Sequence, residues 1–303
     1  MYHILNMKNK KLKISDVFCK KTQNKSSIIL GFDPILDQIP NFINKDNDIS
    51  TILVDFFSFM IETLHDKVAA IKFQSADFEY FGLEGYKALA LCLKKSKQAQ
   101  LLNILDVKRG DIGRSSQAYA NAYLNPLRQN VNHIEVNDFE ADAITISPYM
   151  GTDSIESFID VANTHNKMLF ILLRTSNPGA SFVQNHKDHE LFLYEKLANW
   201  IQEKNHASLG EYGFGSLGVV VGATQEVAID IRKRLSNSLF LMPGLGAQGG
   251  SGTWVKACMN KHQDGVIAPV SRALLYPANK ESNRKEYQQK ILDTLKQLQA
   301  SLT

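Results

Sequence analysis

The sequence has 303 residues, of which 44% are hydrophobic and 21% are charged, and its net charge is +3. This composition excludes a disordered chain and leaves room for one or two folded domains. The charge is uneven, because residues 1–25 contain seven lysines and one aspartate, a balance of +6 that leaves −3 for the remainder. Nucleic-acid binding needs basic residues clustered along a folded surface. We therefore expect no nucleic-acid partner, and we interpret the basic tail as solvated, with an interaction arm as the alternative.

The cysteines and the apolar segments indicate the compartment. Cys19, Cys92 and Cys258 lie far apart, without the spacing of a metal site or a disulfide framework, as in proteins of the reducing cytoplasm. The N-terminus lacks an apolar core of signal-peptide length, and no run of about 18 apolar residues occurs that could form a membrane helix. We expect a cytoplasmic protein with no membrane partner.

The first half of the chain alternates short apolar runs, typical of buried strands, with patterns of helical period. Ser50 is predicted to cap the first long helix. In chain order, this half is predicted to contain a strand at 26–33, a loop with a short helix at 35–50, a helix at 50–66, a strand at 68–73, a helix at 83–98, a strand at 101–105, a helix at 115–129, a strand at 142–147 and a helix at 153–165.

The second half repeats the alternation. It is predicted to contain a strand at 168–173, a helix at 188–205, a surface loop at 206–216, a strand at 217–221, a helix of about ten residues, a strand at 239–242, a helix at 253–262, a strand at 265–269 and a long polar C-terminal helix.

Eight strands, each followed by a helical or looser segment, imply parallel pairing through crossover helices. Eight such units in roughly 250 residues predict an α/β fold of the (β/α)₈ TIM-barrel type. An open, doubly wound sheet is the alternative, but no dinucleotide fingerprint follows the first strand. We predict a single barrel domain over residues 1–303, with a short basic tail at about 1–13.

Ionisable residues gather at the end of the third predicted strand. Asp106 and Lys108 are two residues apart and should share a face, and Asp111 follows between Gly110 and Gly113. Charges buried at a strand end are costly unless they are paired, and pairing shifts their pKa values toward catalytic use. A solvated, salt-bridged turn is the alternative interpretation.

Other polar residues also lie at or just after the carboxyl ends of predicted strands. In a barrel these strand ends converge on the face where active sites lie. The glycine-rich loop 244–250 and Arg272 follow strands seven and eight, the usual phosphate site of this fold. These residues alone predict a phosphate-binding barrel enzyme with an acid–base lysine. The residues at or just after predicted strand ends are Asp33, Lys72, Asp106, Lys108, Ser176, Gln248 and Arg272.

Five segments in the same order carry a family resemblance. The run DVKRGDI at 106–112 resembles the signature of the orotidine 5′-phosphate decarboxylase family, in its longer bacterial subgroup. The supporting segments are GFDP at 31–34, RTSNPG at 174–179, the loop 243–250 and SRALLY at 271–276. The resemblance spans residues 31–277. It implies decarboxylation of orotidine 5′-monophosphate to uridine 5′-monophosphate in pyrimidine biosynthesis, with no cofactor or metal and by a homodimer with shared active sites.

The resemblance also implies roles for individual residues. Lys108 would be the general acid that protonates C6 of the pyrimidine, and Asp106 would face the substrate carboxylate. Lys72 and Asp111 would complete the catalytic charge array. The implied substrate-binding residues are Asp33, Lys72 and Asp111 at the ribose, Ile112 reaching with Asp111 into the neighbouring subunit, Ser115 in place of the family's threonine, Ser176 and Pro243 beside the base, and Gln248, Gly249 and Arg272 at the phosphate.

Three alternatives remain open at this point. A strand end of this kind also suits a Mg²⁺-dependent sugar-phosphate decarboxylase or epimerase of related architecture. A Schiff-base aldolase would use Lys108 or Lys72. A barrel that binds nucleotides or RNA through its basic tail is the alternative outside enzymes.

Overall fold

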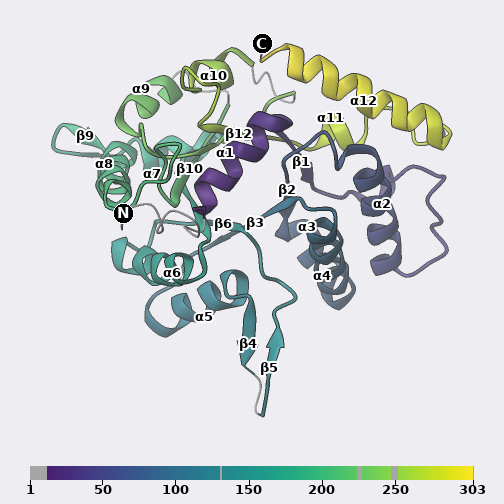
Figure 1. Ribbon diagram of the computed structural model, residues 1–303, viewed down its shortest axis with the longest axis horizontal. Coiled ribbons are helices and arrows are strands. Elements are labelled where there is room, and N and C mark those ends of the chain that lie inside the picture. The colour runs from purple at the N-terminus through teal and green to yellow at the C-terminus, as the bar shows by residue number, and fades with distance from the viewer. Residues whose placement is uncertain (1–11, 130–131, 224–226, 247–251, 303) are drawn as a thin grey trace, which may run out of the picture.

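The computed structural model describes residues 12–129, 132–223, 227–246 and 252–302. Its centre is a closed barrel in which all neighbouring strands are parallel (Figure 1). The predicted (β/α)₈ TIM barrel is therefore confirmed, and each predicted strand overlaps one barrel strand. In chain order these are β1 (Ile28–Phe32), β2 (Ala70–Gln74), β3 (Leu102–Arg109), β6 (Ala143–Ile146), β7 (Met168–Arg174), β10 (Leu217–Val221), β11 (Phe240–Leu241) and β12 (Val266–Val270).

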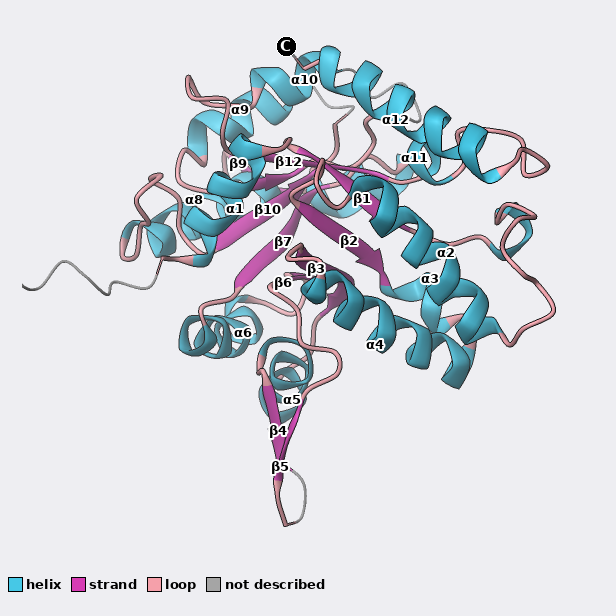
Figure 2. Cartoon of the chain, turned by 45° about the vertical axis from the view of Figure 1, so that its right-hand side comes forward, coloured by secondary structure: helices cyan, strands magenta, loops and turns pink. Residues whose placement is uncertain are grey.

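Helices surround the barrel on its outside (Figures 1 and 2). The longer ones are α2 (Ile49–Leu64), α4 (Gly82–Gln98), α5 (Gly113–Leu124), α6 (Thr152–His165), α8 (Leu193–His206), α9 (Val227–Arg234) and α12 (Arg284–Ala300). The shorter ones are η1 (Leu36–Gln38), α3 (Ser75–Glu79), η2 (Pro178–Ala180), α7 (Ser181–Gln184), α10 (Gly252–Ala257) and α11 (Arg272–Leu275). Across the described residues, no helix combines the length and apolar character needed to span a membrane.

Several predicted boundaries were wrong for local reasons. The cap of α2 is Asp48, whose carboxylate accepts from the Thr51 N–H at 2.9 Å, whereas Ser50 lies inside the helix. The predicted helix 115–129 ends at Leu124, because a residue before proline avoids the helical conformation and Pro126 follows. The predicted helix 188–205 begins five residues late, after the short hairpin of β8 (Lys187–Asp188) and β9 (Leu191–Phe192).

The first helix, α1 (Ile14–Asn24), was not predicted and lies across the end of the barrel at which the strands begin (purple in Figure 1). We call this N-terminal end of the barrel its lower end and the opposite end its upper end. Its buried side chains join the cluster of residues that fills the barrel interior, and the Phe18 ring meets Phe170 of β7 edge-on at 6.3 Å between centroids. The carboxylate of Asp16 accepts from the Tyr212 N–H at 3.0 Å. The basic tail was predicted at about 1–13 and no element was assigned to 14–24, but residues 14–24 form a helix that is a packed part of the barrel.

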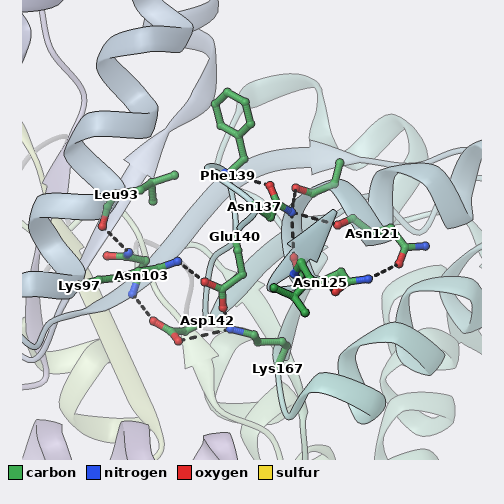
Figure 3. Close-up of polar contacts among 12 residues, drawn as sticks. Leu93, Lys97, Asn103, Asn121, Asn125, Asn137, Phe139, Glu140, Asp142 and Lys167 are labelled. Atoms are coloured by element: carbon green, nitrogen blue, oxygen red, sulfur yellow. Dashed lines mark hydrogen bonds and ion pairs between the residues drawn. The ribbon is translucent and has the colours of Figure 1, made fainter. Parts of the chain in front are cut away.

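A hairpin of β4 (Leu127–Gln129) and β5 (Ile134–Val136) projects from the barrel beyond α5 (Figure 2). It was also missed, because each strand is shorter than a recognisable alternating run. Asn137 anchors its base, since the Asn137 side-chain amide donates to the carbonyls of Asn121, Ala122 and Asn125 at the end of α5 (Figure 3).

Next to this anchor, a group of charged residues lies at the lower end of β3 and β6 (Figure 3); we call Lys97, Glu140, Asp142 and Lys167 the lower charge cluster. The Glu140 carboxylate bonds both Lys97 and Lys167. Asp142 lies 3.7 Å from Lys167 and accepts from the backbone N–H of Asn103 at 2.8 Å. Three separate segments, at residue 97, residues 140–142 and residue 167, are joined by this cluster.

Candidate active site

A cavity of about 530 Å³ lies at the carboxyl ends of the barrel strands. This is the face on which TIM-barrel enzymes place their active sites. All eight barrel strands, or the loops that directly follow them, contribute to its wall. Of the residues predicted for the site, those that line it are Asp33, Lys72, Asp106, Lys108, Ser176, Pro243 and Arg272.

Four of these residues form an alternating chain of acids and bases, which we call the upper charge cluster. The Lys72 ammonium lies 3.2 Å from the carboxylates of both Asp33 and Asp106. The other oxygen of Asp106 accepts from the Lys108 ammonium at 2.7 Å. The side chains of Lys72 and Asp106 are 6% and 10% exposed, whereas that of Lys108 is 45% exposed. Lys108 is therefore the open end of the chain.

The charges of the inner pair stabilise each other. Burial alone would lower the pKa of Lys72, but the neighbouring Asp33 and Asp106 carboxylates outweigh it and raise that pKa above its usual value. Burial alone would raise the pKa of Asp106, but Lys72 and Lys108 hold it at about 2. Both groups are thus charged at neutral pH, and the site presents a fixed electrostatic pattern to a ligand.

The opposite wall of the cavity is formed by the loops after β7, β11 and β12. Ser176 follows β7, and the loop that carries it is fastened by Gln184, whose amide oxygen accepts from the Thr175 N–H at 3.0 Å. Arg272 begins α11 directly after Ser271. A Cβ at Gly31 would lie 2.1 Å from the Ser271 hydroxyl, so glycine there lets the Arg272 loop approach the end of β1.

Five predicted site residues are not among those that line this cavity. Ile112 is 56% exposed on the outer surface, and Asp111 accepts from the Ile112 N–H at 2.8 Å. Ser115 is likewise exposed, on α5. Gln248 and Gly249 lie outside the described residues. Of the two aspartates in the run DVKRGDI, Asp106 therefore lines the cavity together with Lys108, and Asp111 does not.

The cavity also contains polar residues that were not predicted. Gln74 accepts from Lys72 at 3.3 Å and follows it by two residues in β2, so the strand period alone could have identified it. Asp77 lies in α3, where burial and then the Asp33 carboxylate raise its pKa. Thr145 interrupts an otherwise apolar run in β6, and that polar interruption was the available signal.

The cavity and the rest of the described chain contain His, Cys, Asp and Glu side chains, the usual protein ligands of metal ions. Among those residues, no three or more His, Cys, Asp or Glu side chains are grouped to hold a metal ion. The carboxylates of Asp33 and Asp106 that face the cavity are instead bonded to lysines.

A parallel barrel with an alternating charge cluster and a basic loop on one cavity defines the chain as a TIM-barrel enzyme. The sequence profile of the orotidine 5′-phosphate decarboxylase / HUMPS family matches residues 48–287. The chain belongs to that family, as the resemblance predicted.

Individual relatives agree over nearly the whole length. The orotidine 5′-phosphate decarboxylase of Caldicellulosiruptor bescii is 34% identical over 276 residues, covering 88% of this chain and 90% of the relative. That of Clostridium acetobutylicum is 34% identical over 290 residues, covering 95% and 96%. The structure of Leishmania donovani OMP decarboxylase has a TM-score of 0.71 at 28% identity and covers 94% of this chain and 99% of that one. The predicted enzyme class, a carboxy-lyase, is confirmed.

Proposed function

We propose that the chain decarboxylates orotidine 5′-monophosphate to uridine 5′-monophosphate in pyrimidine biosynthesis, with Lys108 as the general acid. Family membership and the names of the curated relatives support the substrate. The observation that carries the mechanism is the position of the Lys108 ammonium, at the open end of a buried acid–base chain and inside the cavity.

The reaction leaves an electron pair on C6 when CO₂ departs. A preorganised cation at that atom stabilises the developing charge, usually the largest single term in catalysis. Asp106 holds the Lys108 ammonium at 2.7 Å and stays ionised, because its pKa is about 2. The substrate carboxylate, placed beside Asp106, would be repelled, and its loss as CO₂ relieves that repulsion. Lys108 then transfers one proton to C6 and regains it from solvent through its exposed end.

Lys72 is a poorer candidate for the acid. Its raised pKa makes proton release costly, and its ammonium is enclosed by two carboxylates and Gln74. We assign it the task of fixing the charge and position of Asp106 and, with Asp33, of bonding the ribose. The two lysines therefore have different roles: Lys72 keeps its proton and Lys108 gives one up.

Binding energy from the 5′-phosphate of the substrate supplies the remaining stabilisation of the transition state. An acceleration near ~10¹⁷-fold corresponds to about 23 kcal/mol. Arg272 faces the same cavity as Lys108 and offers a forked donor to the 5′-phosphate. Ser176 and Pro243 border the base in this arrangement. Interactions with the phosphate, remote from C6, are used to hold the base against the upper charge cluster.

The proposed reaction uses no metal or organic cofactor. The direct test follows the absorbance change of orotidine 5′-monophosphate after treatment of the protein with EDTA. Unchanged turnover supports the proposal. Loss of turnover with EDTA and recovery with Mg²⁺ would instead favour a metal-dependent sugar-phosphate enzyme.

We also propose a homodimer with shared sites, in the cytoplasm. Asp111 and Ile112 follow Lys108 closely in sequence but lie outside its cavity, and Ile112 is exposed. This placement supports a contribution to a neighbouring copy. The three cysteines are free and buried, as suits a reducing compartment.

Subunit complementation tests the shared site. Lys108→Ala and Asp111→Ala should each be inactive, but refolding them together should restore activity. In a two-fold dimer with random mixing, about one quarter of the sites carry neither change. A mixture that stays inactive, although mass spectrometry shows mixed dimers, would refute sharing.

A further inference from the structure

The strand that carries the upper charge cluster loses register with its neighbour where the cavity begins. Leu105 of β3 pairs with Ile144 of β6, but the next pair joins Arg109 to Ile146. β3 takes four steps where β6 takes two, so two extra residues form a bulge. Within it, Lys108 has a φ of 45°, in the left-handed region that residues with a Cβ seldom adopt. Such a conformation persists only where its surroundings hold it.

Thr145 lies opposite this bulge, between the two paired positions of β6, and is 1% exposed. Its hydroxyl accepts from the backbone N–H of Lys108 at 2.9 Å. The same hydroxyl donates to Oδ1 of Asp106 at 2.7 Å, and this oxygen also accepts from the Lys108 ammonium. One buried hydroxyl therefore joins the strained backbone of Lys108 to the carboxylate that orients the Lys108 side chain.

We propose that Thr145 is a positioning residue, whose hydroxyl holds the left-handed bulge that directs the Lys108 ammonium into the cavity. The inference rests on the proposed role of Lys108 as general acid. Without the hydroxyl, the Lys108 N–H loses its acceptor and Asp106 loses one of its donors. The bulge is then free to relax toward a regular strand, and a change of register turns side chains to the other face.

The test compares Thr145→Val, which keeps the shape without the hydroxyl, with Thr145→Ser, which keeps the hydroxyl. Thr63→Val is the matched control, because Thr63 is also buried and its hydroxyl bonds the Phe59 carbonyl in α2, away from the cavity. We expect kcat to fall roughly 10²-fold in Thr145→Val, since a misplacement of about 1 Å costs that much. KM should change little, because the phosphate loops are intact. In Thr145→Ser and Thr63→Val, both kcat and KM should stay near the parent values.

The pH profile provides a readout that a packing role would not move. Asp106 has one donor fewer in Thr145→Val, so the acidic limb of kcat should shift to higher pH. Thr145→Cys introduces a side chain of similar size with a weaker donor, so its kcat should lie between those of the Val and Ser variants. If the Val variant does not fold, Thr145→Cys is measured in its place. Parent-like kcat and pH profile in both Val and Cys variants would overturn the inference, as would a Ser variant as slow as Val.

Lys108→Ala, measured in parallel, separates this inference from the function on which it rests. If Lys108→Ala retains parent activity, the general-acid proposal fails whatever Thr145 does. If Lys108→Ala is inactive while Thr145→Val is fully active, the positioning inference alone fails.

Discussion

The upper and lower charge clusters lie at opposite ends of β3 and β6 and contain the same components, two lysines and two carboxylates that alternate. In the lower cluster neither end lines the active-site cavity, and the side chain of Lys97 at one end is 36% exposed. Glu140 lies between two lysines, and Asp142 is bonded to Lys167 and to the backbone of Asn103. In the upper cluster the chain ends at Lys108, which faces a cavity.

The backbone differs as well. The lower cluster joins ordinary helix ends and strand starts, whereas the upper one includes a residue in left-handed conformation held by a neighbouring hydroxyl. Strain of this kind is retained where function needs a fixed geometry. If Lys108 is the general acid that we propose, alternating charges are structural where they lie away from the cavity and reactive where one of them faces it.

Replacing one lysine by alanine in each of the two charge clusters gives the largest expected difference in kcat. Lys108→Ala should lower kcat by about 10⁴-fold or more, because both proton donation and charge stabilisation are lost. Lys97→Ala, at the lower cluster, should leave kcat per folded molecule unchanged. Steady-state kinetics on both variants, with circular dichroism to confirm folding, checks this. Comparable losses in the two would erase the distinction between the clusters.

The second contrast concerns the proposed contact between Arg272 and the 5′-phosphate of the substrate. Arg272→Ala should lower kcat/KM for the 5′-phosphorylated substrate roughly 10²-fold, the loss expected for charged hydrogen bonds. The unphosphorylated nucleoside should be affected far less. Arg284→Ala is the control, since Arg284 pairs with Glu62 on the surface. An equal loss on nucleotide and nucleoside would remove Arg272 from the phosphate site.

At the lower cluster, stability rather than turnover should respond. Glu140→Gln leaves Lys97 and the buried Lys167 without their shared carboxylate, which should lower the free energy of unfolding by about 3 kcal/mol. Glu62→Gln breaks an exposed pair and should cost about 0–1 kcal/mol. Urea unfolding curves provide both values. If Glu140→Gln costs no more than Glu62→Gln, the lower cluster is not a structural one.

The smallest expected effect is in the acid dependence of stability. Burial works to raise the pKa of Glu140, but its bonds to Lys167 and Lys97 outweigh this and lower it. A lowered pKa contributes stability above the unfolded value near ~4.3, and that contribution is lost as pH falls through the folded value. Burial raises the pKa of Asp142, which acts in the opposite direction. Unfolding free energies between about pH 3 and 7 should fall less steeply with acid in Glu140→Gln than in the parent.

The sequence by itself determined the barrel and most of one wall of the site. Strand periods, helix periods and charged strand ends are local properties, so the eight strands and the positions of Asp33, Lys72, Asp106 and Lys108 could be read along the chain. The motif DVKRGDI indicated the family from the sequence, because the order and spacing of its residues are also local properties.

Tertiary structure alone decided the rest. Helix α1 is short and follows a lysine-rich segment, and its apolar side can be recognised as core only from the barrel end against which it packs. The lower cluster joins three segments, at residue 97, residues 140–142 and residue 167, and a hydroxyl on β6 bonds the backbone of a residue on β3. Such contacts depend on which strands become neighbours and in which register, and no period within a single segment encodes that pairing.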